Sequence, residues 1–305
     1  MGQLEDMQAF IRIVDAGGIG RAAAQMDIAK SAISRRLRDL ETRLGVKLLQ
    51  RTTRVITLTE AGRRYYQSAV KVADDVAELN SVTANADAEL RGTIRLAAPV
   101  SFGVSHLSSV ISDFVALHPQ LEFDIQFSDR HVDLIQEGID LAIRIGDLKD
   151  SSLIARRITP VRLVMCASPA YLAKFGEPQT PDELRSHKVM RYAGSSSGNW
   201  HLIDPEGRNV AAKPKANIIA NNGDFLRDLA IKGQGIIISP TFICWQQLRD
   251  LSLQRVLPNF RVASLDAYAI YPETRYLSPR TRSFINYLVE RFGDSPYWDT
   301  KLDNG

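Results

Sequence analysis

The stretch KSAISRRLRDLE, from Lys30 to Glu41, places four basic and two acidic side chains around three large apolar ones. The apolar residues Ile33, Leu37 and Leu40 lie four and three positions apart, which predicts a helix with one buried stripe that continues to Leu44. The basic and hydroxyl side chains must then point away from this stripe, where they are suited to contact phosphates and base edges. This outward face comprises Lys30, Ser31, Ser34, Arg35 and Arg38.

Two further helical patterns precede this stretch. Apolar residues recur at helical spacing from Leu4 to Val14, DAGG interrupts them, and a second short helix is expected over Arg21 to Met26. Gly45 supplies a stop signal directly after the basic helix. Short helices joined by a tight turn, the last of them basic, predict a helix-turn-helix whose recognition helix enters the major groove.

The segment VKLLQRTTRVITLT, which follows the basic helix, predicts a pair of short strands. Such a hairpin would form a wing beside the recognition helix. Arginines on a wing can lie along the phosphate backbone or reach into the minor groove. We therefore expect Arg51, Thr52 and Arg54 to contact DNA.

Residues 18–23 offer a rival interpretation, because they contain the G-x-G-x-x-A spacing of a dinucleotide-binding fold, with Asp39 and Glu41 about twenty residues further on. In that fold the acidic residue ends a second strand. Here both acids fall inside a strongly helical basic segment, and there is no room for a strand between Met26 and Lys30. The context disfavours nucleotide binding.

The composition indicates a globular protein of two or three domains, since the 305 residues are 45% hydrophobic and 24% charged. Residues 1–64 hold 12 Lys and Arg against 7 Asp and Glu, a net charge of +5, whereas the rest holds 26 against 28. The basic charge is thus concentrated at one end, as in a phosphate-binding module. We find no apolar run near the ~20 residues of a membrane-spanning helix and no signal-peptide pattern, so we expect a cytoplasmic protein without a membrane partner.

A long helix is expected from Glu60, because no proline occurs before Pro99 and no glycine occurs between Gly62 and Gly92. Apolar positions alternate four and three residues apart, which is a heptad pattern. We expect a dimeric coiled coil; the alternative is an amphipathic helix packed on its own domain. The seam comprises Tyr65, Ala69, Val72, Val76, Leu79, Thr83, Ala86 and Leu90.

Strands alternate with helices after Gly92, which predicts an α/β fold with a mostly parallel sheet. One set of strands begins at TIRLAAP and a second at VRLVMCAS, so we expect two lobes with a ligand cleft between them. The last helix, over residues 278–292, is expected to return to the first lobe.

Residues at strand-to-helix junctions are the candidates for binding a ligand. Ser101 opens one helix and Asn221 and Asn222 open another, and a helix amino end favours an anion; for each of them an ordinary capping role is the alternative. Arg144, between two isoleucines of a strand, could point into the cleft or lie on a solvated strand edge. We expect an anionic organic ligand. The candidate effector-binding residues are Ser101, Phe102, Ser128, Arg144, Asn221 and Asn222.

An enzyme is disfavoured. The five histidines show no metal-ligand spacing, and the chain contains neither a G-x-S-x-G nor a phosphate-binding G-x-x-x-x-G-K motif. We therefore predict no cofactor and no metal. The cysteines, Cys166 and Cys244, each lie among apolar residues, which favours buried free thiols, with a redox pair as the alternative.

The stretch AAAQMDIAKSAISRRLRDLETRLGVKLLQRTTRVITLTEAG resembles the LysR-type transcriptional regulators, through its paired alanines and the patterns A-[VI]-S, L-E-x-x-L-G, L-[FL]-x-R and L-T-x-A-G. The likeness continues through LHPQLEF, DLAIRIG, SPAYLAKFG and GIIISP. It departs from the family at Gly20 and Ala29, where a hydroxyl residue is usual, and at Lys30, where glutamine is common. These departures put in doubt the phosphate contacts that the hydroxyl groups make in relatives.

The resemblance implies a winged helix-turn-helix over residues 1–59, a linker and dimerisation helix over 60–90 and an effector-binding domain over 91–305. The effector domain would resemble a periplasmic binding protein, with lobe I at about 91–161 and 266–305 and lobe II at about 162–265. It implies a regulator that binds double-stranded promoter DNA and a small-molecule effector, as a homodimer that assembles into a homotetramer. The alternative is a solute-binding or enzymatic α/β protein with an accessory helical domain.

Overall fold

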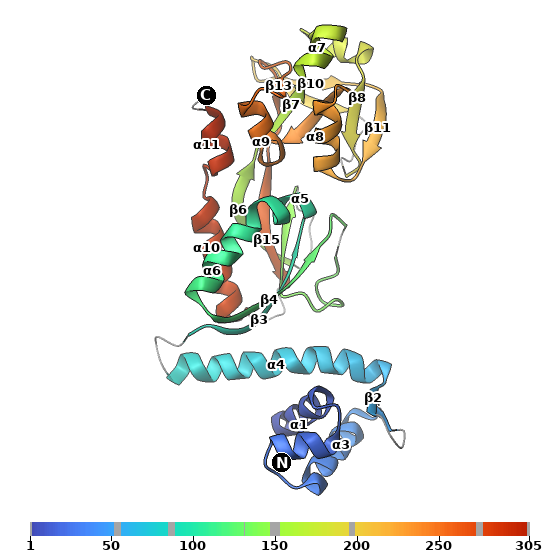
Figure 1. Cartoon of the computed structure of the whole chain (residues 1–305), viewed down its shortest axis with the longest axis vertical. Coiled ribbons are helices and arrows are strands. Elements are labelled where there is room, and N and C mark those ends of the chain that lie inside the picture. Colours follow the sequence, from blue (N-terminus) through green and yellow to red (C-terminus); the bar gives the residue numbers. More distant parts are fainter. Residues whose placement is uncertain are drawn as a thin grey trace. The chain divides into compact units, whose positions relative to one another are not determined.

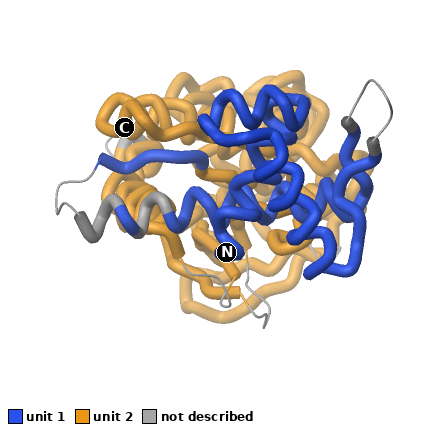
Figure 2. Tube along the Cα trace, turned by 90° about the horizontal axis from the view of Figure 1, so that it is seen from below, with its two compact units in different colours: residues 1–93 blue, residues 94–305 orange. Residues whose placement is uncertain are grey.

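The computed structural model describes residues 2–51, 56–84, 89–130, 132–146, 153–194, 199–272 and 277–303 (Figure 1). The chain divides into two compact units, Met1–Thr93 and Ile94–Gly305, which Figure 2 shows in different colours. The first unit carries the predicted helix-turn-helix, and the second is an α/β unit with two lobes.

The first unit is a three-helix bundle with a two-stranded wing. Phe10, Ile13, Ile33, Leu37 and Leu40 are at most 1% exposed and form its core. The predicted stripe of the basic helix is thus confirmed, except that Leu44 is 39% exposed. The elements are α1 (Gln3–Asp15), α2 (Ile19–Gln25), α3 (Lys30–Leu44), β1 (Leu49–Arg51) paired antiparallel with β2 (Ile56–Leu58), and α4 (Glu60–Ala84).

Two glycines are required where α3 ends and α4 begins. Gly45 ends α3 in the left-handed conformation, with φ of 69°, which a side chain disfavours. A Cβ on Gly62 would lie 1.9 Å from the carbonyl oxygen of Leu48, so only glycine lets α4 approach the wing this closely. Thr59 fixes the same junction, because its hydroxyl donates to the carbonyl of Lys47 at 2.7 Å and accepts from the amide of Gly62.

The helix α4 is shorter than predicted. It is described as helical to Ala84, and Glu89 and Leu90 are not helical. Its first turns pack on their own unit, because the ring of Tyr65 lies 5.5 Å from that of Phe10. The predicted seam therefore begins as an intrachain contact, and Val72, which is 47% exposed, is the first large apolar seam residue left open to a partner.

The second unit is built on two five-stranded sheets (Figure 1). Lobe I has the strand order β4-β3-β5-β15-β6, and helices α6 and α10 pack together beside it. Its elements are β3 (Arg91–Ala98), α5 (Val100–Phe102), a π-helical turn η1 (Gly103–Leu107), α6 (Ser108–Leu117), β4 (Gln120–Phe127), β5 (Leu141–Ile145), β6 (Leu153–Val161), β15 (Leu265–Pro272) and α10 (Pro279–Phe292).

Lobe II has the strand order β11-β8-β12-β7-β13 and a small sheet of order β10-β9-β14. Trp200 is 5% exposed and lies in the core that these two sheets share. The elements are β7 (Leu163–Ala167), α7 (Pro169–Phe175), η2 (Pro181–Ser186), β8 (Val189–Tyr192), β9 (Trp200–Ile203), β10 (Asn209–Ala212), β11 (Ala216–Ala220), α8 (Gly223–Ile231), β12 (Ile236–Pro240), α9 (Thr241–Arg249), β13 (Gln254–Arg255), β14 (Arg261–Val262) and α11 (Tyr297–Asp303).

The prediction of a mostly parallel sheet holds for the pairings described in both lobes, apart from one reversed strand in each sheet, β15 in lobe I and β7 in lobe II. In lobe I, β3 and β5 are parallel, but β15 runs antiparallel to both β5 and β6. In lobe II, β8 pairs in parallel with β11 and β12, whereas β7 is antiparallel to β12 and β13. The reason is topological: the chain leaves lobe I after β6 and returns as β15, and these crossings enter the sheets in the reverse direction.

The end of the chain also differs from the predicted lobe assignment. The elements β15 and α10 return to lobe I, but α11 packs against α9 of lobe II (Figure 1), and Leu302 lies against the core around Cys166. Trp298 of α11 is fully buried between Phe102 and Phe242. The chain therefore crosses between the lobes a third time.

The helix over Val100–Leu117 has a mean hydropathy of 1.4 across 18 residues, which is apolar enough for a membrane-spanning segment. This run contradicts the prediction that the chain holds no apolar segment of such length. Its residues Phe102, Leu107, Val110 and Phe114 are at most 2% exposed and pack into the second unit. It is a core helix of this unit.

Candidate DNA-binding surface and effector site

The recognition surface is the side of α3 opposite its buried stripe. Lys30, Ser31, Arg35 and Arg38 are exposed and Ser34 is half-buried, as the spacing predicted. Lys30 is the first residue of α3, and the preceding Ala29 has no polar side chain to cap the helix. The positive end of the helix dipole therefore lies next to a lysine, which favours an anion such as a phosphate.

Glu41 connects α3 to the wing. It is only 7% exposed, and its carboxylate accepts hydrogen bonds from the amides of Leu48, at 3.0 Å, and Leu49, at 3.3 Å, and from Lys47 Nζ, at 2.7 Å. Burial alone would raise the pKa of Glu41, but these hydrogen bonds outweigh it and the pKa is lowered. A charged carboxylate thus fixes the start of β1 against the recognition helix.

A pocket of about 410 Å³ opens between α3 and the wing, lined by Ser34, Arg38, Glu41, Lys47 and Leu49. The structure therefore brings two of the predicted DNA-binding residues together with Lys47. Arg51 ends β1 at the tip of the described wing. Thr52 and Arg54 lie outside the described residues.

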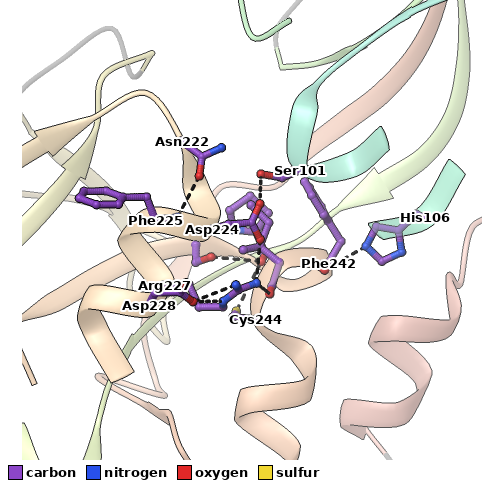
Figure 3. A network of polar contacts seen from close by, with 12 residues as sticks. Ser101, His106, Asn222, Asp224, Phe225, Arg227, Asp228, Phe242 and Cys244 are labelled. Atoms are coloured by element: carbon purple, nitrogen blue, oxygen red, sulfur yellow. Dashed lines mark hydrogen bonds and ion pairs between the residues drawn. The ribbon is translucent and has the colours of Figure 1, made fainter. Parts of the chain in front are cut away.

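The predicted effector site has a contact that the sequence did not indicate. The hydroxyl of Ser101, at the start of the helix in lobe I, donates to Asp224 Oδ2 of α8 in lobe II at 2.5 Å (Figure 3). The amide of Val100 donates to Asp129 Oδ1 at 3.2 Å. Two carboxylates of the chain therefore already occupy the helix amino end that was expected to receive an anion.

The other predicted effector residues have mixed roles. Asn222 caps α8, because its side chain accepts from the amide of Phe225 at 2.9 Å, whereas Asn221 is exposed. The Ser128 hydroxyl accepts from the amide of Arg130 at 3.1 Å. The fully buried Phe102 packs against Phe242 and Phe292, so it belongs to the core rather than to an open cleft, contrary to the prediction.

Arg144 does not lie on a sheet edge, because β5 is flanked by β3 and β15. Its guanidinium is half-buried and donates from Nη1 to the carbonyl of Arg130 at 2.8 Å. Burial lowers the pKa of Arg144. The solvated-edge alternative is therefore wrong.

His106 joins the two lobes from the π-helical turn (Figure 3). Its ring is 2% exposed, with Nε2 at 3.0 Å from the carbonyl oxygen of Phe242 and Nδ1 at 2.6 Å from the hydroxyl of Tyr297. Because a carbonyl oxygen can only accept, Nε2 carries the proton and Nδ1 accepts from Tyr297. Burial lowers the pKa of His106 to about 4, which keeps this arrangement neutral at physiological pH.

Cys166 and Cys244 are distant in sequence but share one core in lobe II, and both are fully buried free thiols. A hydrogen bond between the two side chains raises the pKa of Cys166, an effect that burial adds to, and lowers the pKa of Cys244. The predicted burial is confirmed, and the pair lies beneath the interlobe contacts of α9.

Four groups that make the contacts described above were not predicted from the sequence: Glu41, His106, Asp129 and Asp224. Glu41 could have been found, because it is an acid beside the apolar stripe of a basic helix and must be satisfied if buried. His106 and Asp224 gave no local signal, since their partners are remote: Ser101 and Asp224 are separated by 123 residues.

A helix-turn-helix with a basic exposed face, followed by a two-lobed α/β unit, defines a DNA-binding protein that carries a ligand-binding domain. The family model for bacterial regulatory helix-turn-helix proteins of the lysR family matches residues 4–63, and the LysR substrate binding domain matches residues 87–293. The chain belongs to the LysR family of transcriptional regulators. The rival solute-binding and enzymatic interpretations are thereby excluded.

Relatives of similar length support this assignment. The HTH-type transcriptional regulator YhjC of Escherichia coli K12 is 35% identical over 95% of this chain and 97% of its own. The structure of CrgA, a LysR-type regulator from Neisseria meningitidis, matches with a TM-score of 0.62 and 30% identity over 95% of this chain and 99% of that one. The Vibrio cholerae virulence activator AphB matches with a TM-score of 0.59 and 27% identity over 95% and 99%.

Replacing Glu41 by Gln should destabilise the first unit by about 1–3 kcal/mol and weaken DNA binding, because the amides of Leu48 and Leu49 and the Lys47 ammonium lose their charged acceptor. Urea unfolding and gel-shift titration measure the two effects. Since the pKa of Glu41 is lowered on folding, its stabilisation is present at neutral pH and is lost as the pH falls through the folded pKa. Asp39→Asn, an exposed neighbour, is the control; equal behaviour of the two variants would show that Glu41 does not hold the wing.

Replacing His106 by Gln should reduce the pH dependence of unfolding in the acid range. The folded pKa of about 4 lies below the ordinary 6.5, so the unfolded chain binds more protons between these values and stability falls as the pH drops from 6.5 to 4. This loss is worth about 3 kcal/mol in the wild type. Chemical denaturation at stepped pH measures it, with the exposed His201→Gln as control. An unchanged slope in His106→Gln would contradict the assignment.

Proposed function

We propose that this LysR-type regulator acts in the cytoplasm, reads double-stranded promoter DNA with the amino end of α3 and its wing, and changes its DNA binding when a small organic acid occupies the interlobe site. The observation that carries the DNA-binding part is the exposed basic row on α3, placed opposite Ile33, Leu37 and Leu40, which are at most 1% exposed. The proposed DNA-binding residues are Lys30, Ser31, Ser34, Arg35, Arg38, Arg51, Thr52 and Arg54.

The residues of this set are expected to make two kinds of DNA contact, with base edges and with phosphates. Lys30 begins the helix, and side chains at the amino end of a recognition helix reach base edges in the major groove. Arg35 and Arg38 lie further along the exposed face, where they suit the phosphate backbone. The pocket between Ser34, Arg38 and Lys47 is large enough for a phosphate group, so it would fix the register of the helix on the duplex.

The proposed effector site lies between the lobes and uses the polar groups at the ends of their strands. Ser101 and Asn222 stand at helix amino ends, and Arg144 supplies a half-buried positive charge. Few polar anchors beside an apolar core are typical of small-molecule sites. The set is Ser101, Ser128, Arg144, Asn221 and Asn222; Phe102 is left out because its ring is fully buried.

We also propose that α4 pairs with α4 of a second copy, and that two such dimers form a tetramer. A two-fold pair of winged helices doubles the DNA contact and explains specificity for paired half-sites. The exposed Val72 and the half-buried Val76 are four residues apart, a spacing that places both on one face of the helix, and they support this pairing. The seam residues proposed for this pairing are Tyr65, Ala69, Val72, Val76 and Leu79, of which Tyr65 also packs on its own unit and Ala69 is 2% exposed.

Lys30→Ala should lose specificity, whereas Arg35→Ala should lose affinity for all sequences alike. A base contact contributes ~1–3 kcal/mol of discrimination, and a phosphate contact contributes about one unit to the salt slope. Fluorescence anisotropy on specific and scrambled duplexes across a salt series separates the two. Arg249→Ala, which removes an exposed charge from the other unit, should change neither quantity. Loss on both duplexes to the same extent in Lys30→Ala and Arg35→Ala would remove the distinction, and binding insensitive to salt would reject the DNA surface itself.

The double variant Val72→Asp, Val76→Asp should dissociate the oligomer, because two charges would be buried without partners in the seam at a cost of several kcal/mol. Analytical ultracentrifugation measures the mass, and circular dichroism checks that the chain remains folded. Gln67→Asp, on an exposed position off the seam, is the control. A mass that stays unchanged in the double variant would show that α4 does not form the dimer.

A further inference from the structure

The strongest unexplained feature outside the DNA-binding surface is the carboxylate of Asp224. It lies in the first turn of α8 in lobe II and accepts the Ser101 hydroxyl of lobe I at 2.5 Å (Figure 3). Ser101 is only 7% exposed, so its hydroxyl needs an acceptor in the absence of water. Asp224 supplies that acceptor from within the chain.

Asp224 has a second partner that does not depend on Ser101. Its Oδ1 lies 2.7 Å from Arg227 Nη1, one turn further along α8. Arg227 in turn bonds Asp228 at 2.9 Å and the carbonyl of Ile243 at 3.2 Å, and its side chain is only 20% exposed (Figure 3). The carboxylate would therefore keep a fixed positive partner and the favourable end of the α8 dipole if it left Ser101.

We propose that Asp224 is an internal competitor for the acidic group of the effector: its carboxylate fills the position at Ser101 that the effector's acid takes on binding. The proposal rests on the interlobe site proposed above and adds the residue that sets which acids can use it. When the acid binds, its carboxylate replaces that of Asp224 as the acceptor of the Ser101 hydroxyl, while Asp224 stays paired with Arg227.

The exchange makes the site selective. Asp224 is tethered beside Ser101, so an acid binds only in the fraction of molecules in which the carboxylate has moved away, and its apparent affinity falls by that fraction. An inorganic anion makes no apolar contacts that could offset this loss of apparent affinity. An organic acid with an apolar body gains additional contacts and can displace Asp224. The side chain of Asp224 is 32% exposed, which gives it room to move.

The exchange also couples binding to the lobe arrangement. The bond between Ser101 and Asp224 joins α5 of lobe I to α8 of lobe II, so its replacement removes one interlobe tie. The contacts of His106 with Phe242 and Tyr297 do not involve Asp224 and would remain. An acid thus shifts the equilibrium between lobe arrangements by its preference for the one in which Ser101 and Asp224 have separated.

The test uses the full-length chain and benzoate as the probe, with benzamide as a neutral molecule of the same shape. Calorimetric titration at constant ionic strength measures affinity for wild type, Asp224→Asn and Asp228→Asn. Asp228→Asn is a matched control, because it also removes one carboxylate from Arg227 but does not contact Ser101. We expect Asp224→Asn to bind benzoate about tenfold more tightly than wild type, and Asp228→Asn to resemble wild type. Benzamide should not distinguish the three proteins.

Adding Ser101→Ala to Asp224→Asn should abolish the gain, which would place the probe at Ser101. Equal gains in Asp224→Asn and Asp228→Asn would show a general field effect and overturn the proposal, and so would a failure of benzoate to bind Asp224→Asn. Thermal melting of each variant checks folding. Salt-dependent binding of duplex DNA by the same wild-type preparation tests the regulator function separately, so that either conclusion can fail without the other.

Discussion

The effector unit depends on a neutral imidazole that is buried where its two lobes meet. His106 reaches from lobe I to the carbonyl of Phe242 in α9 and to the hydroxyl of Tyr297 in α11. Each ring nitrogen has one partner, which satisfies a neutral imidazole and stabilises a single tautomer. Because an added charge would be buried at this point, the low pKa and the interlobe geometry have the same cause.

The π-helical turn explains how one helix can contact lobe II at two places. Residues five apart in a regular α-helix point in directions that differ by about 140°. The turn over Gly103–Leu107, with its wider hydrogen-bond spacing, reduces this difference between Ser101 and His106. Both side chains can then meet lobe II, Ser101 at α8 and His106 at α9. The irregular turn is thus placed where it allows one helix to make two interlobe contacts.

Local patterns predicted the elements of this chain well, because apolar spacing and stop signals act within a few residues. The stripe of α3, its end at Gly45 and the opening of α8 at Asn222 all follow from such signals. The reversed direction of β15 could not be predicted in this way, since the chain leaves lobe I after Val161 and returns from the other lobe only at Leu265. The partner of Ser101 was missed for the same reason: an acid in the first turn of a helix is usually explained by the helix dipole alone.

In each unit a buried polar side chain of one element forms hydrogen bonds with a second element and so fixes the spacing between the two. In the first unit the carboxylate of Glu41 on α3 binds the amides at the start of the wing, so the recognition helix and the wing are held as one rigid reader. In the second unit His106 does the same for the lobes, but the neighbouring bond from Ser101 to Asp224 is only partly buried. A fully buried contact of this kind is costly to break, because its groups would be left unsatisfied. A partly exposed one can exchange with a ligand. Burial thus distinguishes the two units: Glu41 is 7% exposed at its contact with the wing, whereas the Asp224 side chain is 32% exposed at its contact with Ser101.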